Sequence, residues 1–305
     1  MKIVVTGGAG FIGSHIVDAY LAKGHKVVII DNLTTGSKKN INPKARFYLA
    51  DIRDFKKIKK ILEKEKPQII NHHAAVAQVA NSFKNPLLTF EVNIMGTASV
   101  LAAAENIKIN KFIFSSSGAV YGDSKMLPAK EENPPEPSSA YGASKLIGEE
   151  LIKFYSRRQG FDYLIFRYAN IFGPRQNPKN EAGIFPIFIS LIKNNIRPTI
   201  FGNPDKTTRD YVYVGDIARA NILALNKGKN TVLNLGSGKE TSNQQVFDAV
   251  AKELSFKKKP TYLSLRPGEI KRSALSAKKA SKIISWAPEI NVKNGLKKTV
   301  EFFNG

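Results

Sequence analysis

Three residues near the middle of the chain could together move a proton and assist a redox reaction. Tyr141 and Lys145 are four residues apart, which places both on one face of a helix, one turn apart. Ser117 ends an apolar run over 111–116, where a strand would terminate. A tyrosine hydroxyl has a pKa near 10, so a tyrosine base at neutral pH needs roughly 4 kcal/mol of phenolate stabilisation. Lys145 can supply part of it.

This trio could provide a general base for a redox reaction at a carbon that bears a hydroxyl. Tyr141 would take the proton from a substrate hydroxyl while hydride leaves the same carbon, and Ser117 would relay or share the hydrogen bond. Ser115 and Ser116 are interpreted as cofactor-side or structural hydroxyls. A Tyr-x-x-x-Lys pair alone could also be an exposed helical pair without function, so its meaning depends on a second motif.

That second motif is a glycine-rich turn near the start of the chain. Gly7, Gly10 and Gly13 follow the apolar run 2–5 and precede a helix-like stretch at 12–23. Gly7 would permit a tight turn, Gly10 the close approach of a pyrophosphate, and Gly13 close packing of helix on strand. A turn that binds nothing is the alternative, but the strand, turn and helix order favours a dinucleotide.

The identity of the dinucleotide follows from the next apolar run, 26–30, which ends in Asp31. A carboxylate roughly 20 residues beyond the glycines can accept hydrogen bonds from both ribose hydroxyls and would repel a 2′-phosphate. The sequence therefore predicts NAD rather than NADP as the cofactor.

The elements that must position these residues indicate an α/β fold. Strand-like runs at 2–6, 26–31, 45–50, 68–73, 111–116 and 162–168 alternate with helix-like stretches. This order predicts a Rossmann-type doubly wound parallel sheet, covered on both faces, with a smaller C-terminal substrate-binding lobe. Residues 127–139, rich in Pro and Glu, are predicted as a loop.

Prolines after Gly173 break the second part of the chain into short pieces. We therefore predict an NAD-binding domain over 1–172 with a returning segment at 210–236. Within that segment we predict a helix at 210–225 and a strand at 232–235. Residues 173–209 and 237–305 would form the lobe, which we expect to bind a nucleotide sugar.

Composition excludes several other kinds of chemistry. The absence of cysteine among 305 residues excludes disulfides, thiolate catalysis and cysteine-ligated zinc. The four histidines form no plausible ligand cluster, so no metal is expected. No apolar stretch approaches the roughly 20 residues that cross a bilayer, and the chain begins with a predicted strand instead of a signal segment. We expect a cytoplasmic protein without a membrane partner.

The chain is strongly basic. Its 47 Lys and Arg against 25 Asp and Glu give a formal charge of +22, which would attract polyanions and steer nucleotide substrates toward the protein. The densest basic tracts, 56–60 and 257–259, lack the interleaved aromatic residues that stack on bases. We interpret them as solvated surface and expect no specific nucleic-acid partner.

The spacing of the glycines resembles that of the extended short-chain dehydrogenase/reductase superfamily. Asp51-Ile52 matches the pair that this family places against adenine, Asn93 fits its pattern, and 72–75 is similar to its fourth-strand ending. His73 stands where an apolar residue is usual. The cofactor-binding residues that motif and resemblance together imply are Gly7, Gly10, Phe11, Ile12, Gly13, Asp31, Asn32, Asp51, Ile52, Ala74, Ala75, Asn93, Ser115, Tyr141, Lys145 and Tyr168.

Within this superfamily, 114–123 and 167–176 resemble the family of UDP-glucose 4-epimerases and related nucleotide-sugar epimerases. Related dehydratases carry acidic residues after the catalytic hydroxyl, where this chain has Gly118 and Ala119. The Glu of related decarboxylases and the Cys and His pair of epimerase-reductases are also missing. The resemblance implies NAD-dependent inversion of the C4 hydroxyl of a UDP-hexose through a 4-keto intermediate. UDP-glucuronate 4-epimerase activity and a non-catalytic NAD-binding regulator are the alternatives.

The same resemblance implies how the substrate would bind. Arg209 and Arg266 match positions that contact UDP, Asn170 matches a diphosphate contact, and Glu269 stands where Asp is commoner. Ser273 is small at a position that gates the hexose pocket, so N-acetyl sugars are expected to fit. The implied substrate-binding residues are Ser117, Asn170, Gly183, Arg209, Arg266, Glu269 and Ser273. Relatives pair through helices that correspond to 87–105 and 141–158, which implies a homodimer.

Overall fold

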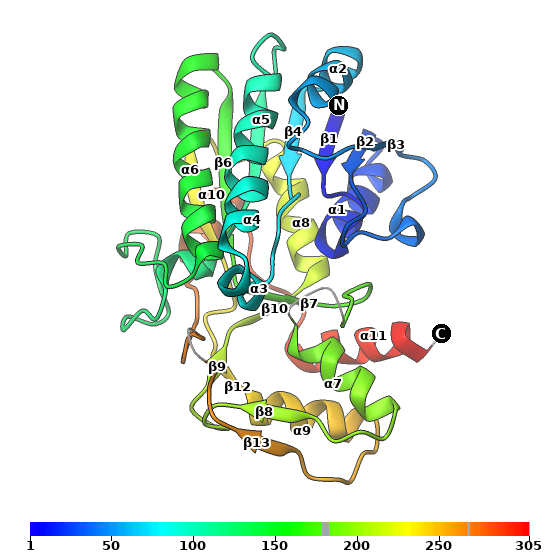
Figure 1. The fold of residues 1–305 in the computed structure, drawn as a ribbon, viewed down its shortest axis with the longest axis vertical. Coiled ribbons are helices and arrows are strands. Elements are labelled where there is room, and N and C mark those ends of the chain that lie inside the picture. The colour runs from blue at the N-terminus through cyan, green and yellow to red at the C-terminus, as the bar shows by residue number, and fades with distance from the viewer. Residues whose placement is uncertain (179–182, 267–268, 305) are drawn as a thin grey trace.

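The centre of the protein is a seven-stranded sheet in the order β11-β6-β5-β4-β1-β2-β3 (Figure 1). The structure is a computed structural model and describes residues 1–178, 183–266 and 269–304. Every pair of neighbouring strands in the sheet is parallel. The strands are β1 (Lys2–Thr6), β2 (Lys26–Asp31), β3 (Arg46–Leu49), β4 (Ile69–His72), β5 (Lys111–Ser117), β6 (Asp162–Tyr168) and β11 (Thr231–Leu235). The predicted doubly wound parallel sheet is confirmed.

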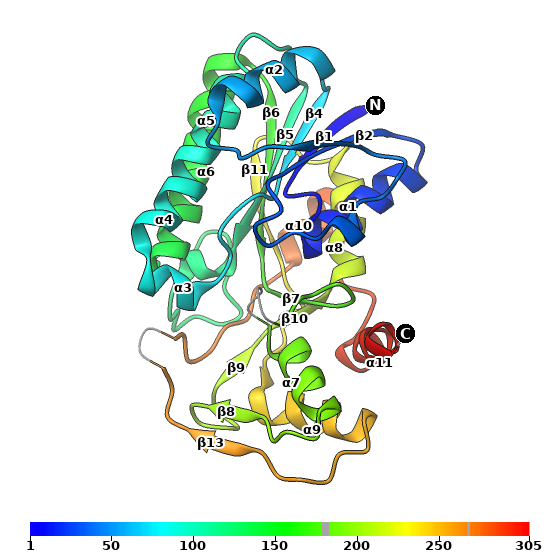
Figure 2. The same ribbon diagram turned by 45° about the vertical axis from the view of Figure 1, so that its right-hand side comes forward.

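Helices cover both faces of the sheet (Figure 2). One face packs against α1 (Phe11–Ala22), α8 (Val214–Ala224) and α10 (Lys278–Ile284), and the other against α2 (Phe55–Glu65), α5 (Gly96–Ala103) and α6 (Ala140–Gln159). Because both faces are buried, the strands are apolar throughout instead of alternating, as Val4 and Val5 show. These two cores hold the carboxyl ends of the strands in fixed positions.

The order of the strands reverses between β1 and β4. From β1 the chain first adds β2 and β3 on one side, and then β4, β5, β6 and β11 on the other. In doubly wound sheets the ligand lies in the crevice outside the carboxyl ends at such a reversal. Thr6, Asp31 and Ser117 end their strands at this edge.

A smaller lobe follows the sheet and lies below it in both views (Figures 1 and 2). Its core joins aromatic residues such as Phe172, Phe185 and Phe247. It is built from short strands and helices: β7 (Asn170–Phe172), α7 (Ile184–Lys193), β8 (Thr199–Phe201), β9 (Thr208–Arg209), β10 (Tyr211–Tyr213), β12 (Thr241–Ser242), α9 (Asn243–Glu253), β13 (Thr261–Leu263) and α11 (Val292–Asn304).

The helix expected over 210–225 was wrong in its first turn. Tyr211–Tyr213 form β10 and pair in parallel with β7, and α8 begins only at Val214. The alternation of aromatic and β-branched residues favours a strand once a partner strand is present. The strand expected at 232–235 is confirmed as β11, beside β6.

Part of the C-terminal segment returns to the main sheet. Ala280 and Ile284 of α10 join the core beneath α8 and β11, together with Trp286, which is fully buried. The Trp286 Nε1–H donates to the carbonyl oxygen of Asp216 at 2.8 Å. The division of the chain into domain and lobe stays a prediction. That division assigned α10 to the lobe, although it packs in the core of the main sheet.

One helical stretch, Pro86–Ala103, is long and apolar enough to cross a membrane by length and composition alone. It comprises α4 (Pro86–Phe90), the π-helical η2 (Glu91–Met95) and α5. From the sequence we expected no stretch near this length, and that expectation was wrong by length and composition, since this one has a mean hydropathy of 1.3. In the fold it packs against α2 and α6, with Val100 and Leu101 buried.

Candidate functional site

The predicted catalytic trio lies where β5 ends and α6 begins. Ser117 is the last residue of β5, and its Oγ accepts a hydrogen bond from Ala119 N at 3.1 Å. Ser139 caps α6 by accepting from Gly142 N at 3.1 Å, which fixes Tyr141 in the first turn. A Cβ on Gly142 would lie 2.5 Å from the Ala119 carbonyl oxygen. The glycine therefore lets the helix pack closely against the turn after Ser117.

Burial shifts the pKa values of Tyr141 and Lys145 in opposite directions. Burial raises the pKa of Tyr141, and a hydrogen bond with Ser117 lowers it. Burial lowers the pKa of Lys145 to about 7, against the charge of Glu149. Its Nζ donates to the carbonyl oxygen of Ser115 at 2.7 Å and lies 5.8 Å from the centre of the Tyr141 ring. With its pKa raised, the Tyr141 phenol is protonated at neutral pH in the protein without ligands.

A buried ion pair behind Lys145 was not foreseen from the sequence. Glu149, one helical turn beyond Lys145, accepts two hydrogen bonds from Arg167 of β6, at 2.9 and 2.7 Å, and one from Ser116 Oγ at 2.5 Å. Arg167 Nη1 also donates to the Tyr121 hydroxyl at 2.9 Å. The spacing of Glu149 from Lys145 placed it on the same helix face, which was the one available signal.

The glycine-rich turn has the shape that a dinucleotide requires. Gly7 has a φ of +70°, and a Cβ there would lie 2.7 Å from Ala74 N at the end of β4. A Cβ on Gly13 would lie 2.1 Å from the Gly7 carbonyl oxygen. Gly10 directly precedes α1 and has no side chain to occupy the helix start. The predicted cradle of backbone at a helix N-terminus is therefore present, with Phe11 and Ile12 in its first turn.

Asp31 lies beside this cradle, at the end of β2. Its carboxylate accepts hydrogen bonds from Ala9 N at 3.0 Å and Leu33 N at 2.8 Å, and its burial raises its pKa. A Cβ on Gly36 would come within 2.9 Å of Oδ1, so glycine lets the chain pass close to the carboxylate. Two backbone donors orient the group while leaving acceptor capacity for hydroxyls.

The pair predicted to face adenine is held by its neighbours. Asp51 accepts from Asn32 Nδ2 at 3.0 Å and from Arg53 at 3.0 and 2.9 Å, and these side-chain hydrogen bonds from Arg53 hold its pKa below its usual range. Arg53 was missed from the sequence. Ile52 is buried, and a Cβ on Gly96 would lie 2.5 Å from its Cδ1.

Three other predicted cofactor residues use their polar groups inside the protein. Asn93 bonds both backbone groups of Val76, at 2.8 and 3.0 Å, and donates to Ser144 Oγ at 2.9 Å. It thereby joins the loop that carries Ala74 and Ala75 to α6. Ser115 Oγ donates to the His72 carbonyl oxygen, and the Tyr168 hydroxyl faces the core. Their contacts to NAD stay predictions.

Apart from Ser117, which ends β5, the predicted substrate residues lie in or beside the elements of the smaller lobe. Arg209 Nη1 donates to the carbonyl oxygens of Thr208 and Lys271, at 2.8 and 3.3 Å. The Ser273 N–H donates to Thr208 O at 3.2 Å, so Ser273 adjoins the same strand. Asn170 Nδ2 donates to Asp210 O at 3.4 Å. Gly183 lies against Gln176, whose Nε2 would be 2.4 Å from a Cβ there.

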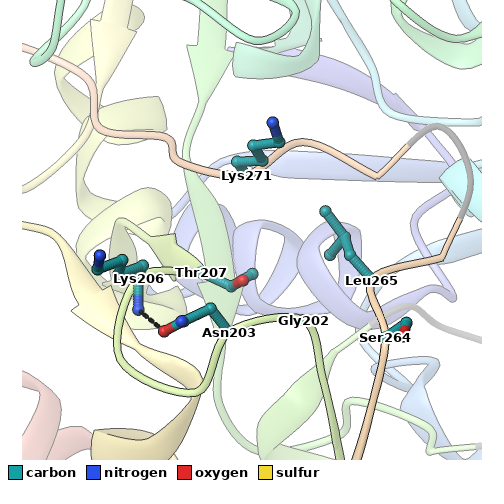
Figure 3. A pocket seen from close by; sticks show the side chains of 7 residues that line it. All are labelled: Gly202, Asn203, Lys206, Thr207, Ser264, Leu265 and Lys271. Atoms are coloured by element: carbon teal, nitrogen blue, oxygen red, sulfur yellow. Dashed lines mark hydrogen bonds between the residues drawn. The ribbon is translucent and has the colours of Figure 1, made fainter.

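A hollow of about 420 Å³ lies near Arg209, which contacts its lining residue Lys271 (Figure 3). Close to it, the Arg266 guanidinium lies 3.8 Å from the centre of the Phe201 ring and 3.5 Å from Glu269. Phe201 was missed from the sequence, because nothing local predicts which aromatic side chain lies under the arginine. The lining residues are Gly202, Asn203, Lys206, Thr207, Ser264, Leu265 and Lys271. An arginine stacked on an aromatic ring, beside a hollow whose lining includes Lys206 and Lys271, suits an anionic ligand.

Comparison with known proteins now identifies the family. The profile of the "NAD dependent epimerase/dehydratase family" matches residues 3–236. The chain belongs to this family. A Methanocaldococcus jannaschii protein provisionally named UDP-glucose 4-epimerase is 48% identical over 98% of this chain and 97% of its own length.

Solved structures of family members superpose closely on the whole chain. A Thermotoga maritima UDP-glucose 4-epimerase with UDP-glucose has a TM-score of 0.97 at 40% identity, over 100% of this chain and 99% of its own. A Thermus thermophilus UDP-glucose 4-epimerase in complex with NAD has a TM-score of 0.94 at 37% identity, over 100% and 99%. A Methanobrevibacter ruminantium UDP-N-acetylglucosamine 4-epimerase has a TM-score of 0.92 at 39% identity, over 99% and 98%.

Like its family, the protein uses NAD, and its residues fit that cofactor. The positive φ of Gly7, the close packing of Gly13 on Gly7, and the Asp31 carboxylate at the end of β2 fit the turn, the phosphates and the ribose of a dinucleotide. In the described ranges, no group of three or more His, Asp or Glu side chains could hold a metal ion.

Proposed function

We propose that the protein inverts the C4 hydroxyl of a UDP-hexose, interconverting UDP-glucose and UDP-galactose. The observation that carries this proposal is the placement of Tyr141, hydrogen-bonded to Ser117 and adjoining the buried Lys145, at the edge of the sheet that holds the glycine cradle. When bound, NAD supplies a reversible hydride acceptor. The similarity to UDP-glucose 4-epimerases over the whole chain supports this substrate class.

The chain's own residues would handle the proton. Tyr141 takes the proton of the C4 hydroxyl as hydride leaves that carbon, which gives a 4-keto sugar. After the keto sugar has rotated, hydride returns to its opposite face and Tyr141 returns the proton to the C4 oxygen. Ser117 shares the hydrogen bond to the same oxygen. The ammonium of Lys145 stabilises the phenolate, and the backbone carbonyl of Ser115 keeps that ammonium in place. The net reaction consumes neither oxidant nor reductant.

The lobe would hold the nucleotide diphosphate while leaving the hexose free to rotate. Arg209 and Arg266 are suited to phosphate, because a guanidinium donates two parallel hydrogen bonds. Asn170 would meet the diphosphate and Glu269 the uridine ribose. In this arrangement all charged contacts fall on the UDP part of the substrate. At the carbon that reacts, Tyr141 and Ser117 would contact the sugar.

Two alternatives make different predictions. A UDP-glucuronate or other sugar-nucleotide 4-epimerase would share the chemistry but use different pocket residues, and a regulator would bind NAD and UDP-sugar without converting it. The purified protein, without added NAD, should be incubated with UDP-galactose, UDP-glucuronate and UDP-N-acetylgalactosamine, and product stereochemistry measured. Formation of UDP-glucose supports the proposal. Binding of every UDP-sugar without conversion would refute it in favour of a regulator.

We also propose that N-acetyl sugars are accepted. Ser273 is a small residue beside Thr208, and the structurally similar Methanobrevibacter ruminantium protein is a UDP-N-acetylglucosamine 4-epimerase. Ser273→Tyr should remove turnover of UDP-N-acetylglucosamine and leave that of UDP-glucose. Absence of N-acetyl turnover in the unaltered protein would refute this proposal.

The protein is further proposed to act as a cytoplasmic homodimer that needs no membrane or nucleic acid. Large apolar side chains are exposed on α4, η2 and α6, where Leu87 is 73%, Met95 63% and Phe154 52% exposed. A second copy could cover this face, since the same helices would meet on both subunits. Light scattering should give the mass of a dimer, and Met95→Glu that of a monomer. A monomeric unaltered protein would contradict the proposal.

A further inference from the structure

The backbone of His73 lies at the edge of the glycine cradle, and its imidazole stacks against the ring of Tyr168. The His73 N–H donates to the carbonyl oxygen of Thr6 at 3.1 Å, where β1 ends, and a Cβ on Gly7 would lie 2.9 Å from the His73 carbonyl carbon. His73 directly follows β4, at the reversal of the strand order. The backbone therefore fixes His73 beside the turn that would receive the dinucleotide phosphates.

A buried chain of hydrogen bonds leads to this imidazole from α8. The Asn221 amide donates to the carbonyl oxygen of Ile217 at 2.9 Å, and a carbonyl can only accept, so this contact fixes which end of the amide is Nδ2. Its Oδ1 accepts from Asn71 Nδ2 at 2.9 Å, which agrees with that orientation. Asn221 Nδ2 then donates its other hydrogen to the Tyr168 hydroxyl at 3.1 Å.

The direction of this chain favours one tautomer of His73. The Tyr168 hydroxyl has a single hydrogen, and since it accepts from Asn221 it can give that hydrogen to His73 Nε2, 3.0 Å away. Burial lowers the pKa of His73 to about 3, aided by the charge of Lys145, so the ring is neutral. With Nε2 as acceptor, the one ring hydrogen is on Nδ1.

That hydrogen has no acceptor within the protein. Nδ1 of His73 is buried and lacks a hydrogen-bond partner throughout residues 1–178, 183–266 and 269–304. Leaving a buried donor unmet costs free energy, whereas an apolar side chain would fill the same space without that cost. An acceptor on a bound ligand would meet this donor once the ring or its neighbours shift, because Nδ1 is closed to solvent in the unliganded protein.

We propose that the Nδ1–H of His73 donates a hydrogen bond to an oxygen of the diphosphate and nicotinamide-ribose part of NAD. The location selects this part of the cofactor. His73 adjoins Gly7, and it is within electrostatic reach of Lys145 at the reacting end. The adenosine end belongs to Asp31 and Asp51, beyond β1 on the other side of the sheet. The proposal rests on the binding of NAD and is independent of which sugar reacts.

His73→Phe keeps the ring and removes the donor, so it is the variant of choice. In the holoenzyme, competition of unlabelled NAD against labelled NAD should show affinity lowered roughly tenfold, the usual effect of one buried hydrogen bond. Tyr20→Phe is the matched control. Its hydroxyl belongs to the same chain, 2.7 Å from Asn71 Nδ2, but Ile217 still orients Asn221 without it. The control should retain the unaltered affinity.

Fragments of the cofactor separate the possible acceptors. AMP should compete equally well against His73→Phe and the unaltered protein. A loss of affinity that begins with ADP assigns the acceptor to the diphosphate, and one that begins with ADP-ribose assigns it to the ribose. An unchanged affinity for NAD, or an equal loss in Tyr20→Phe, would overturn the proposal and leave only a water as the partner of Nδ1.

Two further measurements keep the test independent of folding and of turnover. His73→Phe leaves the Tyr168 hydroxyl without an acceptor, so the double variant His73→Phe, Tyr168→Phe should be compared if the single variant melts early. Nitrogen-15 NMR of the unaltered holoenzyme should show His73 protonated on Nδ1, with slow solvent exchange of that proton. Protonation on Nε2 instead would contradict the direction of the chain and overturn the proposal.

Discussion

The ammonium nitrogen of Lys145 donates to the carbonyl oxygen of Ser115, 2.7 Å away. Ser115 precedes Ser117 by two residues in β5, so one strand carries the serine hydroxyl and also holds the lysine. A backbone acceptor cannot rotate away as a side chain can. The amino group is therefore held near the Tyr141 ring before any ligand binds, so that little reorganisation is needed when it is protonated and the phenolate forms.

Removal of the Tyr141 hydroxyl should abolish most of the activity without affecting cofactor retention. Tyr141→Phe keeps the ring and the Lys145 anchor but leaves no group to take the C4 proton, so kcat should fall by roughly 10²–10⁴-fold. Turnover of UDP-galactose and the NAD content of the purified protein are the measurements. Tyr155→Phe, farther along α6, is the control and should retain full activity. Near-normal turnover in Tyr141→Phe would rule out this tyrosine as the base.

The buried pair of Glu149 and Arg167 should be sensitive to the loss of one partner. Glu149→Ala leaves the Arg167 guanidinium buried without its counter-charge, which we expect to lower the free energy of unfolding by roughly 3–5 kcal/mol. The double variant Glu149→Leu, Arg167→Met removes both charges and should be less destabilised. Urea denaturation gives both values.

The exposed pair of Glu150 and Lys153 on the same helix provides the control for this experiment. Glu150→Ala should change the free energy of unfolding by about 0.5 kcal/mol or less, as is usual at an exposed position. If Glu149→Ala were no more costly than Glu150→Ala, the buried pair would have no structural role.

The strands and the glycine-rich turn could be predicted from local sequence, whereas contacts between residues far apart in the chain could not. Apolar runs such as 2–6 and 162–168 are strands because burial on both faces demands it, and glycine spacing is a local signal. Tyr211–Tyr213 became a strand only because β7 lies beside it. Contacts between Arg167 and Glu149, or between Arg266 and Phe201, join distant parts of the chain that no local pattern brings together.

The stability of the protein should fall below pH 6.5 because His72 is buried in its neutral form. Burial, with a smaller effect of the Lys145 charge, lowers the pKa of His72 to about 3. Its ring nitrogens contact Thr6 Oγ1 at 2.6 Å and Thr97 Oγ1 at 3.0 Å. Between pH 6.5 and 3 the unfolded chain binds a proton at this histidine and the folded chain does not, so unfolding free energy decreases as the pH falls.

His72→Gln removes this titration and tests the expectation. Between pH 6.5 and 5, the unaltered protein should lose about 1.5 kcal/mol more unfolding free energy than the variant. Chemical denaturation at a series of pH values gives the difference. Parallel pH profiles for the two proteins would show that His72 does not titrate as its burial implies.

The fate of the hydrogen on C4 tests the central claim most directly. UDP-galactose with deuterium on C4 should be incubated in ordinary water with the purified protein, and the UDP-glucose formed examined by mass spectrometry and NMR. If Tyr141 removes only the hydroxyl proton while the C4 hydrogen travels as hydride to NAD and back, the product retains deuterium on C4. Replacement of that deuterium by solvent hydrogen would contradict the account.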